Sequence, residues 1–113
     1  FEADQRTALN RSGAGFCPLE LVAAALGACM VLTMAAVAEH KGIPVTRLEA
    51  SVEGQTEFAD RRATTRFVSR LTVNEGLTPR EQRILFNSAR QCEVHKMLEG
   101  EVVFEETIDT SDL

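Results

Sequence analysis

Tryptophan and tyrosine are absent from this 113-residue chain, and six phenylalanines are its only aromatic residues. We therefore expect an aliphatic, alanine-rich core in which phenylalanines are the largest pieces. A secretory signal has a basic start followed by an apolar stretch and a cleavage site, and the N-terminus does not show this pattern. We therefore predict no secretory signal and a cytoplasmic location. The chain begins with Phe1 rather than methionine, and we expect its N-terminal strands to be missing or shortened.

Positive charge is scarce. Twelve lysines and arginines face seventeen acidic residues, which gives a net charge of −5. A nucleic-acid partner is not expected, because such binders need a basic patch to neutralise phosphates. Four arginines do recur at short spacing, but among threonines and serines in a strand-like segment, where we expect a solvated face: Arg61, Arg62, Arg66 and Arg70.

Cysteine occurs only three times. An odd count without secretory context does not suggest a disulfide scaffold, so the thiols are expected to be buried, metal-bound or catalytic. No glycine-rich phosphate loop, serine nucleophile elbow or paired-carboxylate motif appears. The 44% hydrophobic and 26% charged residues are ordinary for a globular protein, and the length predicts a single domain over residues 1–113.

One long stretch, Leu21 to Ala38, has no charged side chain. We predict a helix from Pro18, which fits the first turn, to Lys41, with Gly42 as its stop. A membrane span, which normally requires about 20 apolar residues, is the alternative. The alanine-rich composition favours a buried central helix and no membrane partner. A single small domain can hardly surround such a helix, so we expect a homodimer.

The rest of the chain predicts an α+β fold in which an antiparallel sheet packs on this long helix. Two segments in which apolar and polar residues alternate are expected to form a hairpin with one solvent-exposed face. The phrase Thr78-Pro79-Arg80-Glu81 predicts a helix start with a capping box. The predicted elements are strands at 45–58 and 65–74 joined by a turn at 59–62, a helix from 79 to a break near Cys92, a short helix at 93–99 and a last strand at 101–108.

The candidate chemistry lies with cysteine and histidine. Cys29 sits inside the apolar helix, where a thiol is either core packing or, beside a cation or hydrogen-bond donor, a nucleophile. Cys92 lies at a helix end, where unpaired backbone N–H groups favour a thiolate. His95 follows three residues later and either lowers the thiol pKa as an imidazolium or caps and packs. His40 is expected to be only a partner for the helix dipole.

Zinc is an alternative use of the same residues. Cys17, Cys29, Cys92 and His95 together would form a Cys₃His set. Zinc motifs usually supply their ligands in close pairs, and only Cys92 and His95 have that spacing. We therefore expect no metal and no other bound cofactor.

Two phrases resemble a known family. Pro18-Leu19-Glu20-Leu21, followed by Ala24-Ala25-Leu26-Gly27-Ala28-Cys29, resembles the first-cysteine helix of the OsmC/Ohr family, the osmotically inducible and organic-hydroperoxide-resistance proteins. Cys92-Glu93-Val94-His95 is similar to the family's second-cysteine segment, often Cys-Pro-Val-His, and its Cys-x-x-His form to the broader OsmC-like branches. The order of elements extends the resemblance over residues 16–108.

The resemblance implies a thiol-dependent peroxidase that defends against oxidative stress by reducing organic hydroperoxides and also hydrogen peroxide. It implies that Cys29 becomes a sulfenic acid and that Cys92 then forms a disulfide with it. An external dithiol would reset the pair. The resemblance also implies an intertwined homodimer with active sites at the interface. The alternative is a non-peroxidase that binds a small apolar ligand or a partner at that interface.

Some positions depart from the peroxidase branches. Leu19 stands where the Ohr branch has a glutamate. Glu20 follows one residue later, and because one residue turns a helix by about 100°, Glu20 is expected to face a different direction. Glu20 and His95 are therefore supporting candidates only. The branch's activating arginine comes from an N-terminal loop; Arg6 or Arg11 would have to substitute, and no motif assigns either. Cys17 is either a third redox thiol or a small helix-flanking residue.

Overall fold

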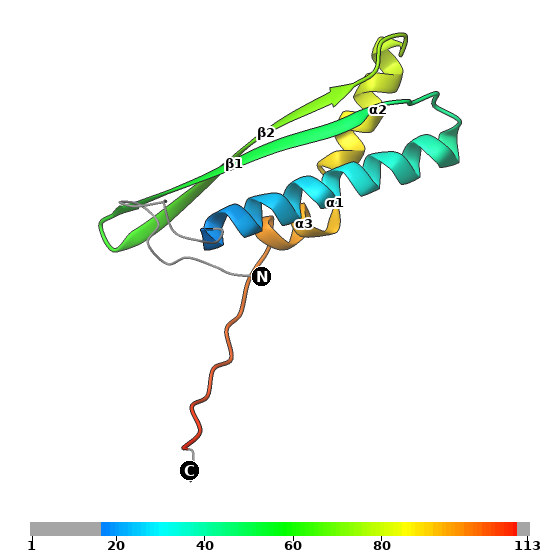
Figure 1. Cartoon of the computed structure of the whole chain (residues 1–113). Coiled ribbons are helices and arrows are strands. Elements are labelled where there is room, and N and C mark those ends of the chain that lie inside the picture. Colours follow the sequence, from blue (N-terminus) through cyan, green and yellow to red (C-terminus); the bar gives the residue numbers. More distant parts are fainter. Residues whose placement is uncertain (1–16, 111–113) are drawn as a thin grey trace.

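A hairpin of two long strands lies along one side of a long helix, and two shorter helices follow it (Figure 1). The computed structural model describes residues 17–110. Its elements are α1 (Pro18–Lys41), β1 (Leu48–Ala59), β2 (Arg62–Val73), α2 (Pro79–Ala89) and α3 (Glu93–Glu99). The predicted α+β class and its antiparallel sheet are confirmed.

Helix α1 has the bounds that the sequence predicts. Pro18 takes its first position, where a missing N–H is not needed. Gly42 adopts the left-handed conformation, with φ of 68°, that a residue without Cβ enters freely. The backbone N–H groups of Gly42 and Ile43 then bond to the carbonyls of Glu39 and Ala38, so that two of the last carbonyls are paired.

One stripe of α1 is buried: Ala23, Leu26, Gly27, Met30, Met34 and Ala38. The opposite side is exposed, and Leu32 there is 71% accessible. Within this chain the helix is therefore buried on one side rather than on nearly all sides. By length and composition α1 is also able to cross a membrane, with a mean hydropathy of 2.3, a test that the core helix of a soluble protein passes equally.

Strands β1 and β2 pair without interruption from Leu48 opposite Val73 to Ala59 opposite Arg62. Only Asp60 and Arg61 form the turn, both at positive φ, as a two-residue hairpin requires. The predicted core faces are correct, since the strand side chains that pack against the helical core are Leu48, Val52, Phe67, Leu71 and Val73. Phe58 and Val68 are large apolar strand residues that are exposed, at 83% and 52%. The predicted strand at 45–58 begins too early, since β1 begins at Leu48. The N–H groups of residues 46 and 47 donate hydrogen bonds to the Asn74 side chain instead of to a neighbouring strand.

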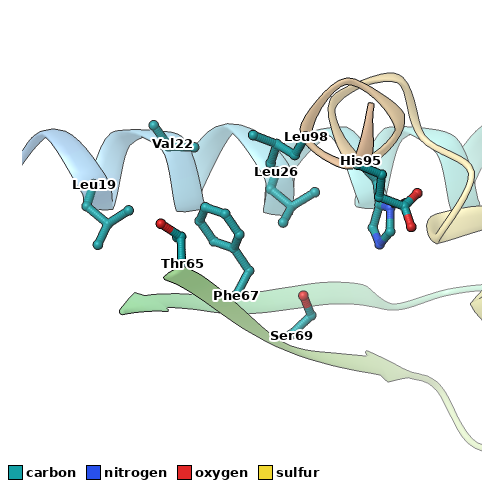
Figure 2. A pocket seen from close by; sticks show the side chains of 9 residues that line it. Leu19, Val22, Leu26, Thr65, Phe67, Ser69, His95 and Leu98 are labelled. Atoms are coloured by element: carbon teal, nitrogen blue, oxygen red, sulfur yellow. Dashed lines mark hydrogen bonds and ion pairs between the residues drawn. The ribbon is translucent and has the colours of Figure 1, made fainter. Parts of the chain in front are cut away.

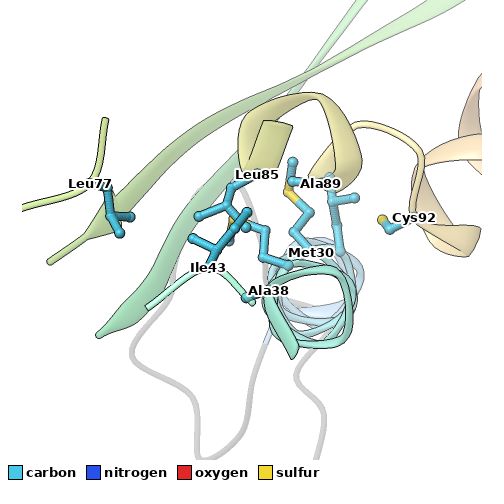
Figure 3. Close-up of a cluster of buried hydrophobic side chains, with 9 residues drawn as sticks. Met30, Ala38, Ile43, Leu77, Leu85, Ala89 and Cys92 are labelled. Carbon is cyan, nitrogen blue, oxygen red and sulfur yellow. The ribbon is translucent and has the colours of Figure 1, made fainter. Parts of the chain in front are cut away.

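The start of α2 is the predicted capping box. The Glu81 N–H donates to the Thr78 hydroxyl at 3.1 Å, and the Glu81 carboxylate accepts from the Thr78 N–H at 2.9 Å. Leu85 and Ala89 are the buried residues of this helix. They join the methionines of α1 in one apolar cluster, which extends to Cys92 (Figure 3). Packing of α2 on α1 therefore fixes where the second cysteine lies.

The predicted last strand, 101–108, is wrong. Residues 101–110 form no helix or strand, and the segment leads away from the body of the protein (Figure 1). Its side chains are open to solvent: Phe104 is 78% and Ile108 97% accessible. Alternation of apolar residues suits a strand, but a strand also needs a neighbour for its N–H and C=O groups. In residues 17–110 the only strands, β1 and β2, are paired with each other.

Candidate functional site

Cys29 and Cys92 are brought together, although they lie far apart in the sequence. Cys29 is half-buried in the middle of α1, and Cys92 is 1% exposed at the N-cap of α3. A tight turn after α2 carries Cys92 back toward α1. Two hydrogen bonds close this turn: the Gln91 N–H donates to the Ser88 carbonyl, and the Cys92 N–H donates to the Ala89 carbonyl. The Cys92 thiol donates toward the Cys29 sulfur, and no disulfide joins the two.

The pKa of the Cys29 thiol lies below its ordinary value of 9.0. The largest cause is the Val94 backbone N–H, which donates to the Cys29 sulfur, while desolvation opposes it. The Cys92 thiol and the Glu93 N–H lower this pKa further. Neither lysine nor arginine is among the groups that act in this way within residues 17–110. Neutral donors at the start of α3 thus lower the Cys29 pKa, against desolvation and the negative charge of the Glu93 carboxylate.

The pKa of Cys92 shifts in the opposite direction. Burial is the main cause that raises it, and negative charge on Cys29 raises it further. The His95 N–H, 3.4 Å from the Cys92 sulfur, opposes these effects. The two thiols therefore differ: Cys29 loses its proton first and Cys92 keeps its own. This asymmetry suits one sulfur to attack and the other to follow as a protonated partner.

A cavity of about 580 Å³ lies between the first half of α1, the middle of β2 and α3 (Figure 2). Its lining is more apolar than polar, and the polar side chains are spread along it: Leu19, Val22, Leu26, Thr65, Phe67, Ser69, His95, Leu98 and Glu99. Leu26 is one helical turn before Cys29, about 5 Å along the axis. His95 follows directly after Val94, whose N–H reaches Cys29. The lining thus includes a residue three positions from each cysteine, Leu26 and His95, although neither cysteine is itself a lining residue.

The other candidate residues do not gather at the pair. Glu20 is exposed and lies with Ala23 and Ala24 beside β1, not in the cavity. Cys17 is buried just before α1, about 18 Å from Cys29 along the helix at 1.5 Å per residue. No three metal-binding side chains cluster anywhere in the part of the chain that the structure describes.

The remaining predicted residues are placed as follows. His40 is exposed in the last turn of α1, as expected of a group near the negative end of the helix dipole. Arg6 and Arg11 lie outside the described residues. His95 lines the cavity, and its Nδ1 is 2.9 Å from the Glu99 carboxylate.

Sequence reasoning missed the β2 side of the cavity. Thr65, Phe67 and Ser69 all point toward α1 (Figure 2). The signal was present, since alternate residues of a strand face the same side and their partners on β1 are the helix-facing ones. The donors from α3 were also missed individually, because a sequence shows that a helix begins at Cys92 but not which sulfur its N–H groups reach.

A family model described as OsmC-like protein matches residues 11–107. Among solved structures, the chain is similar to an OsmC like protein from Mycoplasma pneumoniae, with 22% identity and a TM-score of 0.74 over 87% of this chain and 71% of that one. It is also similar to an organic hydroperoxide resistance protein OsmC from Legionella pneumophila, with 20% identity, a TM-score of 0.69 and coverage of 79% and 66%.

A third similar structure is the organic hydroperoxide resistance protein OhrB of Bacillus subtilis, with 22% identity, a TM-score of 0.63 and coverage of 78% and 66%. The chain thus spans just under two thirds of the length of these two hydroperoxide resistance proteins. At such identities the likeness establishes the fold. No curated protein matches the sequence.

Proposed function

The chain belongs to the OsmC-like protein family, and on that premise we propose that it is a thiol-dependent peroxidase that reduces organic hydroperoxides in defence against oxidative stress. The observation that carries the proposal is the asymmetric cysteine pair. Cys29 has a lowered pKa and the adjacent Cys92 has a raised one. A mostly apolar cavity is lined by Leu26 and His95, each of which is three residues from one of the cysteines. An attacking thiolate, a protonated second thiol and room for an apolar substrate are what the reaction needs.

In the first step the Cys29 thiolate attacks the terminal oxygen of the hydroperoxide. The O–O bond breaks, an S–O bond forms, and the products are a Cys29 sulfenic acid and the alkoxide of the substrate, which takes up a proton to leave as the alcohol. Sulfur loses two electrons and the peroxide gains them. The apolar lining of the cavity would hold the organic part of the substrate, with its peroxide end toward α3.

In the second step the Cys92 sulfur attacks the sulfenic acid. A disulfide forms, and the Cys92 proton leaves with the departing hydroxide as water. An external dithiol then reduces the disulfide and returns both thiols. The chemistry calls for no metal, flavin or haem. Because a dithiol reductant works in a reducing compartment, we propose that the protein is cytoplasmic.

The pair itself can be tested with a single turnover. With one equivalent of cumene hydroperoxide and no reductant, we expect two of the three thiols to disappear and peptide mapping to find a Cys29–Cys92 disulfide. Cys92→Ser should stop at a Cys29 sulfenic acid that dimedone traps. Cys17→Ser, the matched control, should form the disulfide like the wild type. A disulfide that involves Cys17, or thiols that survive the peroxide, would contradict the proposed pair.

We also propose that the protein is a homodimer that buries the exposed side of α1. That side carries small apolar residues and one large one: Ala24, Ala25, Ala28, Leu32, Ala35 and Ala36. Small side chains let another backbone approach closely, and a shallow hollow beside them is lined by Val31, Ala50 and Val52. A second copy of the chain offers the same apolar surface, as a two-fold symmetric interface requires.

The dimer predicts a mass of about twice 12.4 kDa by sedimentation equilibrium. Leu32→Glu should shift the protein toward the monomer, because two carboxylates would be buried across the interface without partners. Arg80→Glu, a charge change at an exposed position in the first turn of α2, should leave the mass unchanged. A wild-type protein that stays monomeric at high concentration would contradict the proposed interface.

A further inference from the structure

An imidazole lines the cavity between α1, β2 and α3. The chain has two histidines, and they occupy different environments: His40 is exposed at the end of α1, whereas His95 lines the cavity. Figure 2 shows the His95 ring directed into the space between α1 and β2, on the side where Ser69 lies. The His95 side chain is only 24% accessible. An imidazole held in this way is placed to exchange a proton with whatever occupies the cavity.

Glu99 fixes the direction of the His95 ring. Its carboxylate oxygen is 2.9 Å from His95 Nδ1, one helical turn away on α3. A hydrogen bond at Nδ1 holds the proton on that nitrogen and leaves Nε2 as the atom available to a ligand. The same residue is tied to the cysteine pair through its backbone, since the His95 N–H donates to the Cys92 sulfur at 3.4 Å. The backbone of His95 is therefore held at the Cys92 sulfur, and its ring is held by the Glu99 carboxylate.

The proposed first step leaves a proton to be supplied. An alkoxide is a poor leaving group unless it is protonated as the O–O bond breaks. The Val94 and Glu93 backbone groups stabilise the Cys29 thiolate but cannot give up their protons. Cys92 is held in its protonated form and needs that proton for the second step. Among the cavity-lining residues only His95 and Glu99 carry side chains that exchange protons readily.

We propose that His95 is the general acid that protonates the leaving alkoxide, with Glu99 as its positioning residue; this rests on the peroxidase function proposed above. The Cys29 thiolate, the hydroperoxide and protonated His95 give the Cys29 sulfenic acid, the alcohol and neutral His95. One S–O bond forms, the O–O bond breaks, and one proton passes from Nε2 to the alkoxide oxygen. Solvent then returns the proton to His95.

The test compares three reagents that all react with the Cys29 thiolate but leave different groups. tert-Butyl hydroperoxide leaves an alkoxide, which needs a proton. Peracetic acid leaves acetate and iodoacetamide leaves iodide, and both anions depart without one. For His95→Gln we expect a loss of about 10²-fold in the rate of Cys29 oxidation by tert-butyl hydroperoxide. Its reaction with peracetic acid and its alkylation at Cys29 should stay within about twofold of the wild type.

His40→Gln is the matched control, since it makes the same chemical change at the exposed histidine and should react like the wild type with all three reagents. Glu99→Gln should show the pattern of His95→Gln with a smaller loss. An equal loss with all three reagents would mean that His95 only shapes the site, and it would overturn the proposal. So would full activity of His95→Gln with tert-butyl hydroperoxide.

The outcomes also separate this proposal from the function on which it rests. If the wild-type protein reacts with tert-butyl hydroperoxide and His95→Gln reacts equally fast, only the role of His95 fails. If wild-type Cys29 reacts with iodoacetamide but with neither peroxide, the peroxidase function fails and the role of His95 fails with it.

Discussion

Cys29→Ser is expected to abolish hydroperoxide consumption, with a fall in turnover of roughly 10⁴-fold or more. The change replaces one sulfur by oxygen in a half-buried position, so helix α1 and its packing should persist. A serine hydroxyl does not ionise near neutral pH, and the Val94 N–H group that favours a thiolate has no anion to stabilise there. Cys92 does not replace it as the attacking thiol, because burial raises the pKa of Cys92.

The measurement is hydroperoxide consumption with a dithiol reductant, over alkyl hydroperoxides and hydrogen peroxide. Cys17→Ser is the control, because it makes the same atomic change at a buried thiol outside the pair and should keep wild-type turnover. Wild-type turnover no faster than that of Cys29→Ser would contradict the peroxidase proposal. The cavity would then be better understood as a site for a small apolar ligand, which native mass spectrometry of the purified protein would detect.

Local features of this fold could be predicted from the sequence because their causes are local. Pro18 and Gly42 set the ends of the long helix through a fixed φ and a left-handed conformation, and Thr78 with Glu81 forms the predicted capping box. Alternation along the two strands correctly assigned their core-facing sides. In each case the information lies within a few neighbouring residues.

Features that depend on distant partners were harder. The last strand failed because alternation around Phe104 cannot show whether another strand lies beside it. Proximity of Cys29 and Cys92 followed from a family resemblance and not from spacing, since it depends on how α2 packs on α1. The lowered pKa of Cys29 depends on backbone N–H groups, which every residue has and no motif marks. Sequence reasoning looked for an arginine as the activating group, whereas in residues 17–110 the donors are the start of α3 and the other thiol.

The packing of α2 on α1 should matter both for the stability of the fold and for the position of Cys92. Leu85→Ala should lower the free energy of unfolding by about 2–5 kcal/mol, the usual cost of removing a large side chain from a close-packed core. Leu85 is 1% exposed and belongs to the cluster that joins α2 to the buried methionines Met30 and Met34 of α1 (Figure 3). Because this contact also positions Cys92, formation of the Cys29–Cys92 disulfide should slow in the same variant.

Urea denaturation at one fixed protein concentration measures the effect, since unfolding of a dimer depends on concentration. Phe86→Ala is the matched control: it removes a larger side chain from the next position of α2, but one that is 51% exposed, with the Arg90 guanidinium 5.7 Å from the centre of its ring. We expect it to cost about 1 kcal/mol or less. Equal costs for the two variants would mean that the contact between α2 and α1 does not carry the stability assigned to it. A Leu85→Ala protein that is destabilised yet forms the disulfide at the wild-type rate would instead show that Cys92 is held by α3 alone.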